Sequence, residues 1–428
     1  MQEQESGTLR AVAWSEIWPW LSLIRCFRLA VSFRLLLLSG LAILLTLTGW
    51  RIFAIPFSRN PEIAKHVEPY PGCPWRAITD QVPNSPPLLD TAVRFIPEMP
   101  LPTRPEPPSI LERERETEPF WGSWKHLSRS VREIFSAGVT PARLAFWLLC
   151  VVWTLAIWAL FGGAITRVVA VRFAAEEHVG WGPMFGHALR KWRAYFAAPL
   201  FPLLAVVLIA APIALTGLMF RWLDWPVLIA GIVWPMLLVG GLLMTALLLG
   251  LLFGWPLMWA TISAEGTDSF DALSRSYDYV FHRPLHYLFY AVVAGLLGYL
   301  GWLLVLNFAA AIVALTYGAA GWGSGPDRME AIAKGTVDLG YAGVAGAVLI
   351  RFWVGCVKVL AVGFLYSYFW TASTAIYFLL RRNVDATEMD EVHLDEQEEQ
   401  PPHGLPPIKT DAAGAPVVDE GDGDPEDA

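Results

Sequence analysis

The chain has 428 residues, of which 55% are hydrophobic and only 16% are charged. A soluble globular protein carries about 25% charged residues, so this composition argues against a soluble domain. Long apolar runs with tryptophan and tyrosine near their ends are typical of helices anchored at membrane–water interfaces, and the chain has 21 tryptophans. The basic residues are scattered along the flanks of these runs, so nothing in the sequence suggests nucleic-acid binding.

The net charge of −8 combines two parts of opposite sign. From Asn383 to Ala428 there are 15 acidic side chains and one basic side chain, Lys409, while the rest of the chain holds 30 basic and 24 acidic residues. An acidic segment rich in proline and glycine, without aromatic residues, cannot bury enough apolar surface to become ordered. We therefore expect residues 381–428 to form a disordered tail.

Six apolar runs are long enough to cross a bilayer, which takes about 20 residues. They predict an all-α fold, a polytopic membrane helix bundle with spans at 35–55, 143–166, 196–219, 227–260, 287–317 and 353–380. The fourth run would be about 51 Å of helix against a hydrocarbon core of about 30 Å. It offers no polar turn that could reverse the chain in lipid, so we expect one long helix, kinked at Pro235 or Pro256.

These spans divide the chain into five expected parts. They are a cytoplasmic amphipathic segment (1–34), a retained first anchor (35–55), a proline-rich extracytoplasmic loop ending in an amphipathic helix (56–142), a five-span bundle with two cytoplasmic amphipathic helices (143–380) and the acidic tail (381–428). Positive charge marks the cytoplasmic side of short loops. The loop 167–193 holds five basic residues and the last span ends at Arg381 and Arg382. The pattern predicts a bacterial inner-membrane protein with both termini in the cytoplasm.

The expected outer loop contains 14 prolines between Pro61 and Pro119. Proline at this density favours extended backbone, so we expect no compact domain in the loop. At its end, apolar residues recur at helical spacing from Phe120 to Phe135, with Lys125, Arg129 and Arg132 on the other side. Two interpretations remain open: a helix lying flat on the outer membrane surface, and a helix packed on other parts of the protein.

The stretch "EGTDSFDALSRSYDYVFHRPLHYL" at 265–288 concentrates acids and histidines between two apolar runs. Asp268 is placed to cap a helix that Pro284 ends. The spacing predicts an amphipathic helix at the cytoplasmic interface. Its expected apolar stripe is Phe270, Leu273, Tyr277, Val280 and Phe281, and its expected polar stripe, with i,i+4 pairs, is Asp271, Arg275, Asp278 and His282.

A metal site is the alternative interpretation of this stretch. Asp278, His282 and His286 would be the ligands, although Pro284 interrupts the helix between the two histidines. Further ligands could come from the other cytoplasmic loop: Glu176, Glu177, His178 or His187. The sequence has no recognised metal signature and its four cysteines have no zinc spacing, so we expect no cofactor.

The other cytoplasmic loop is basic and is expected to form a second amphipathic helix. Arg190, Lys191 and Arg193 are the candidates for binding anionic lipid headgroups. The stretches "FDALSRSYDYVF" and, less closely, "FGHALRKWRAYF" resemble a broad group of bacterial six-span membrane proteins, which includes the membrane region of some glycerophosphodiester phosphodiesterases. The resemblance covers about residues 143–380. It implies an architecture and no catalytic residue, because this chain has no phosphodiesterase domain.

The spans contain few ionisable residues, which argues against an ion-coupled transporter. Arg351 and Lys358 are expected near the outer interface, and Asn307 is expected to form a hydrogen bond between helices. We expect a non-enzymatic scaffold or accessory subunit that contacts the lipid bilayer and a membrane or cytoplasmic protein partner. A permease or lipid-handling protein and a membrane-embedded metal-dependent hydrolase are the alternatives.

Overall fold

The computed structural model describes residues 18–57, 63, 119–136, 140–174, 179–220, 225–334, 340–389 and 391–393. Within these ranges the regular elements are twelve α-helices and one 3₁₀ turn (Pro19–Leu21), with no strand, so the predicted all-α class is confirmed. The chain divides into a unit ending at Val392 and a C-terminal unit that lies almost entirely outside the described residues. Most of the predicted tail (381–428) and most of the proline-rich loop also lie outside them. The first residues of the predicted tail are helical, because the last helix continues to Val384.

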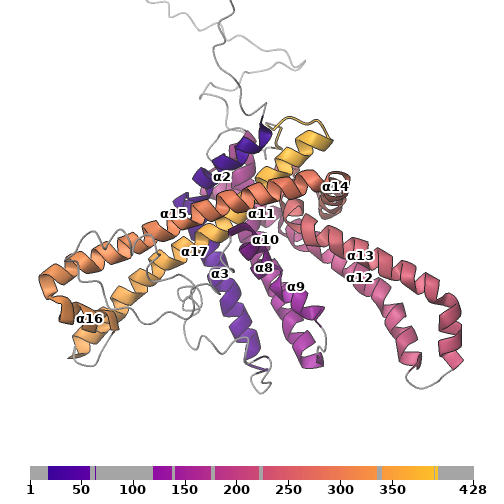
Figure 1. Ribbon diagram of the computed structural model, residues 1–428, viewed down its shortest axis with the longest axis horizontal. Helices are drawn as coiled ribbons and strands as arrows, with labels where there is room; N and C mark the ends of the chain where they lie inside the picture. The colour runs from indigo at the N-terminus through magenta and orange to yellow at the C-terminus, as the bar shows by residue number, and fades with distance from the viewer. Residues whose placement is uncertain are drawn as a thin grey trace, which may run out of the picture. The chain divides into compact units, whose positions relative to one another are not determined.

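Six long apolar helices match the six predicted spans (Figure 1). They are α3 (Phe33–Ala54), α10 (Pro141–Ala174), α12 (Trp192–Phe220), α13 (Trp225–Glu265), α15 (Pro284–Ser324) and α17 (Gly340–Val384). Each is long enough and apolar enough to cross a bilayer, so the chain is a multi-pass membrane protein. The six remaining α-helices are short: α2 (Ser22–Ala30), α8 (Pro119–Leu127), α9 (Arg129–Ile134), α11 (Trp181–Arg190), α14 (Ser269–His282) and α16 (Pro326–Lys334).

The fourth span is one helix, as predicted. α13 is 41 residues long, with Pro235 and Pro256 inside it, and Figure 1 shows it changing direction along its length. α12 runs beside α13, and many of the large apolar side chains along this pair are exposed. In a bilayer such exposure costs nothing, because lipid tails are as apolar as leucine.

Glycines bring the spanning helices into close contact with aromatic side chains. A Cβ on Gly298 of α15 would lie 2.5 Å from the ring of Tyr368 in α17, and one on Gly363 of α17 would lie 2.5 Å from the Leu36 carbonyl oxygen in α3. The first and last spans therefore pack backbone to backbone. Small residues at helix contacts are the expected means of close approach in lipid.

The helix at the end of the proline-rich loop packs on other parts of the protein, which is the second of the two interpretations. Phe120 of α8 is 3% exposed, and its ring lies 5.5 Å from that of Phe369 in α17. The indole N–H of Trp124 donates a 3.0 Å hydrogen bond to the carbonyl of Leu252, well inside α13. Trp121 lies against Gly295 of α15. α8 contacts α15 and α17, and α9 contacts α10, so this segment is docked among the spanning helices.

The buried face of α14 differs from the predicted apolar stripe. Phe270 and Phe281 are exposed, and Val280 is the buried member of that stripe. The buried face consists of Ala272, Ser276, Tyr279 and Val280. Ser276 packs against Gly254 of α13 because two small residues allow the helices to approach closely. The helix boundaries agree with prediction: Asp268 caps the first turn through its carboxylate, and α15 begins at Pro284.

Asn307 was expected to join two helices, and that expectation is wrong. Its side-chain N–H donates a 2.6 Å hydrogen bond to the carbonyl of Leu303 in the same helix. An amide N–H four residues after a helical carbonyl can be satisfied locally, whereas the buried Asn307 Oδ1 has no hydrogen-bond partner among the described residues.

Candidate functional site

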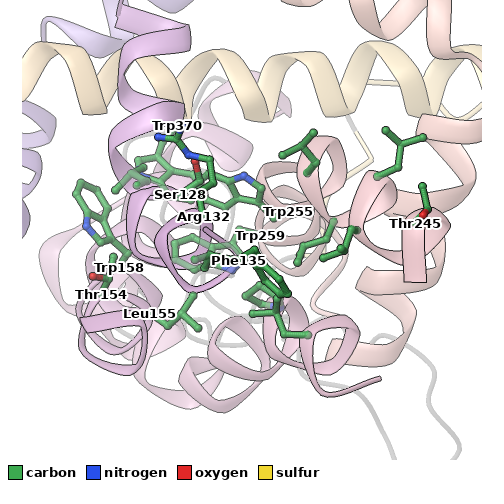
Figure 2. A pocket seen from close by; sticks show the side chains of 18 residues that line it. Ser128, Arg132, Phe135, Thr154, Leu155, Trp158, Thr245, Trp255, Trp259 and Trp370 are labelled. Atoms are coloured by element: carbon green, nitrogen blue, oxygen red, sulfur yellow. The ribbon is translucent and has the colours of Figure 1, made fainter. Parts of the chain in front are cut away.

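A pocket of about 470 Å³ lies among α8, α9, α10, α12, α13 and α17. Its volume is within the range of small-molecule sites, about 300–1,000 Å³. Figure 2 shows four tryptophans on its wall, Trp158, Trp255, Trp259 and Trp370, with Thr245 toward one end and Thr154 toward the other. The lining residues of α13 extend from Thr245 to Trp259, which corresponds to about 21 Å of helix. The pocket therefore extends over much of the ~30 Å hydrocarbon thickness.

The tryptophans are fixed by their contacts with one another and with a glycine. The rings of Trp259 and Trp370 stack with centroids 4.5 Å apart and an interplanar angle of 4°. Trp255 meets Trp370 edge-on at 5.5 Å. A Cβ on Gly162 of α10 would lie 2.5 Å from the Trp259 ring, so only glycine leaves room for this stack.

The pocket wall is almost entirely apolar, and its hydroxyl groups are already used. The Ser128 hydroxyl donates to the carbonyl of Trp124, and the Thr245 hydroxyl donates to that of Gly241. The Thr154 hydroxyl accepts a 3.0 Å hydrogen bond from the indole of Trp50. Arg132 of α9 is the charged residue among the pocket-lining residues that the structure describes. Such a wall suits a hydrocarbon chain better than a polar solute.

The floor of the pocket continues into a buried polar network. The indole N–H of Trp259 donates to the carbonyl of Tyr195, at 2.9 Å, and the Tyr195 hydroxyl lies 2.7 Å from the Ser263 hydroxyl. Ser263 also lies 2.6 Å from the hydroxyl of Thr166, and its carbonyl accepts a 2.7 Å hydrogen bond from Arg167. The network is therefore a continuous set of hydrogen bonds between α10, α12 and α13, and Trp259 joins it to the pocket.

Glu265, the last residue of α13, joins three helices. One of its carboxylate oxygens accepts a 2.5 Å hydrogen bond from the Tyr377 hydroxyl and lies 3.0 Å from Arg275 of α14 and 3.5 Å from Arg381 of α17. The glutamate side chain is 9% exposed. The sequence analysis did not select Glu265 as a site residue. The available signal was its position, as the first acidic residue after a long run without ionisable side chains.

The predicted polar stripe on α14 is partly present. His282 Nδ1 lies 2.6 Å from Asp278 Oδ1, which is the expected i,i+4 pair. Arg275 pairs with Glu265 and not with Asp271, because Glu265 is held beside it by the end of α13. The stripe borders a polar hollow on this side of the molecule, where the Tyr279 hydroxyl donates to Asp385. Burial, with a smaller effect of Asp385, raises the pKa of Tyr279.

The proposed metal ligands are not gathered into one site by the described residues. His286 lies on α15, with its ring 6.5 Å from that of Tyr290, whereas Asp278 and His282 lie on α14. In the described ranges, no three histidine, cysteine, aspartate or glutamate side chains are arranged to hold a metal ion. Three of the additional candidates, Glu176, Glu177 and His178, lie outside those ranges, so the metal site stays a prediction.

The three headgroup candidates differ in their surroundings. Arg190 and Arg193 are exposed, whereas the ammonium group of Lys191 donates a hydrogen bond to the carbonyl of Gly266, just after α13. Lys191 therefore joins the basic loop to the acidic stretch, and lipid binding by the three residues stays a prediction.

Comparison with protein-family models, with curated proteins and with solved structures finds no match to this chain.

Proposed function

We propose that this protein binds a lipid or similar amphiphile within the membrane, which is the lipid-handling alternative of the sequence analysis. The observation that carries the proposal is the elongated, tryptophan-lined pocket of about 470 Å³. Burying a hydrocarbon chain there would gain packing contacts without leaving polar groups unpaired. The role of scaffold or accessory subunit, which the sequence analysis favoured, depends on the proline-rich loop and the acidic tail, and the described residues offer no site in support of it.

The pocket is accessible from the lipid phase. Phe135, the residue after α9, and Leu249 of α13 line it, and both are also exposed, at 51% and 45%. An exposed lining residue marks the side on which a pocket opens. Because α12 and α13 expose apolar surface along most of their length, the space outside this opening is expected to be lipid.

We also propose that the protein lies in a bacterial inner membrane with both termini in the cytoplasm. Basic residues support this orientation, because positive charge marks the cytoplasmic side and basic side chains lie at the helix ends that would face the cytoplasm. Arg34 at the start of α3 donates to the carbonyl of Gly180, before α11, and Lys191 binds Gly266, after α13. In a chain freed of native cysteines, a membrane-impermeant maleimide added to intact cells should label Gly323→Cys and spare Ser274→Cys. Labelling of Ser274→Cys would contradict this orientation.

Two adjacent residues of α12 allow a matched test of lipid binding. Leu203 lines the pocket, whereas Leu204 is 53% exposed and does not line it. Thermal unfolding of the purified, delipidated full chain should shift upward and saturate as phospholipid is added. Leu203→Trp should abolish the shift by filling the pocket, and Leu204→Trp should retain it. Equal shifts in both variants, or a shift that never saturates, would reject the proposed pocket.

A further inference from the structure

We infer that the ligand of this pocket is a phospholipid of net negative charge whose phosphate binds Arg132. This inference rests on the proposed function and specifies its ligand. A lipid in the pocket must place its polar head at a point where charge is tolerated, because an ionised group buried without a partner is strongly destabilising. Arg132 provides that point among the described lining residues.

The charge around Arg132 favours an anion. α8 and α9 carry Lys125, Arg129 and Arg132, and their acid, Glu133, is engaged elsewhere. Glu133 Oε2 lies 2.6 Å from the guanidinium of Arg143, at the start of α10. Because Glu133 is paired with Arg143, it does not neutralise Arg132. The α8–α9 segment thus presents positive charge beside an apolar pocket.

The guanidinium of Arg132 is held in place with donors remaining. One of its nitrogens donates a 2.6 Å hydrogen bond to the carbonyl of Lys125, which fixes the side chain against the last turn of α8. A guanidinium has five N–H donors in a planar fork, which suits two oxygens of a phosphate. An arginine positioned in this way recognises phosphate more specifically than a mobile lysine does.

The apolar wall suits the acyl chains of the same ligand. Apart from Arg132, the described residues that line the pocket are uncharged. A phospholipid therefore fits the combination of one cation and an elongated apolar wall better than a simple alkane does.

The test compares two phospholipids with identical acyl chains, phosphatidylglycerol and phosphatidylcholine, binding to the purified full chain in a neutral detergent. Dissociation constants are measured by native mass spectrometry at fixed salt. The wild-type protein should bind phosphatidylglycerol at least about tenfold more tightly, the amount that one hydrogen-bonded charge pair supplies. Arg132→Gln should weaken phosphatidylglycerol binding more than phosphatidylcholine binding, and so remove this preference, because both lipids carry a phosphate but only phosphatidylglycerol is a net anion. Arg132→Lys should restore part of the preference.

Lys125→Gln is the matched control, since it removes the same charge from the same segment at an exposed position outside the pocket. It should keep the preference within about threefold. Equal wild-type affinity for the two lipids would overturn the inference without any variant, as would equal losses in Lys125→Gln and Arg132→Gln. Free inorganic phosphate that competes as well as the lipid would also overturn it. In all these cases the proposed lipid binding would stand, whereas loss of saturable binding of both lipids by the wild type would reject the proposed function itself.

Discussion

The indole rings of Trp259 and Trp370 lie face to face, with centroids 4.5 Å apart and planes within 4° of parallel. One residue comes from α13 and the other from α17, and both line the candidate pocket. The stack separates the apolar pocket from the polar network around Tyr195 and Ser263, because Trp259 contacts both. The geometry of this pair therefore determines where the apolar interior of the protein ends.

Gly162 makes the stack possible, so its substitution should be destabilising. In Gly162→Ala the new methyl group would meet the Trp259 ring at 2.5 Å, and we expect a loss of about 1–3 kcal/mol in the free energy of unfolding. Gly241→Ala in α13 is the control, because its Cβ would meet no atom within 4 Å and alanine favours helix. Thermal unfolding in detergent compares the two, and equal stability of both variants would contradict the packing.

Glu265 should be a strong determinant of stability at the ends of α13, α14 and α17. Glu265→Gln keeps the shape of the side chain but leaves Arg275 and Arg381 without their shared carboxylate. Loss of a buried partner costs about 3–5 kcal/mol, and the partial exposure of Arg275 reduces the expected effect to about 1–3 kcal/mol. Asp271→Asn, at an exposed position on α14, should change the unfolding free energy by less than about 0.5 kcal/mol.

His126 should make stability depend on pH. Burial, with a smaller effect of Arg129, lowers the pKa of His126 to about 4, and its ring stacks on Trp50 and meets Tyr366 edge-on. The unfolded chain protonates this histidine near pH 6.5, so the folded state binds fewer protons between these two values. Its contribution is complete above pH 6.5 and is lost as the pH falls toward 4, by about 3 kcal/mol at most.

Replacement of this side chain isolates its effect. In His126→Phe the unfolding temperature should fall less steeply between pH 6.5 and pH 4 than in the wild type. His282→Phe is the control, because His282 is exposed and faces Asp278. If both variants kept the wild-type slope, His126 would not be the group responsible.

The docking of α8 among the spanning helices predicts a pattern of chemical accessibility. With the native cysteines removed, Ser123→Cys should resist a water-soluble maleimide in the folded protein, because Ser123 is 3% exposed. Lys125→Cys, two residues later on the exposed side, should react readily. Both should react after denaturation, and rapid labelling of Ser123→Cys before it would place α8 outside the bundle.

The spans and helix ends could be predicted from sequence because their causes are local. Length and hydropathy define the six long helices, and Asp268 and Pro284 mark the two ends of α14 through cap chemistry and the missing N–H of proline. The buried face of α14 could not be predicted in the same way. The usual assumption that large apolar residues face inward fails beside lipid, where Ala272 and Ser276 face the protein and Phe270 does not.

The pocket and the place of α8 depend on contacts between distant parts of the chain. Trp121 meets Gly295, and Trp124 meets Leu252, across more than a hundred residues. No periodicity within either segment encodes these pairs. The same holds for Glu265, whose partners Arg275, Tyr377 and Arg381 are brought to it by two other helices.

The docked position of α8 also has a consequence for biosynthesis. α8 leaves the ribosome early, but its contacts at Phe369, Gly295 and Leu252 belong to spans that are translated later. Because chains fold as they are synthesised from the N-terminus, this short helix has no place to dock until the final span has been inserted. Its docking is thus a late step of assembly, and the chain completes the candidate pocket only once nearly all of it has been made.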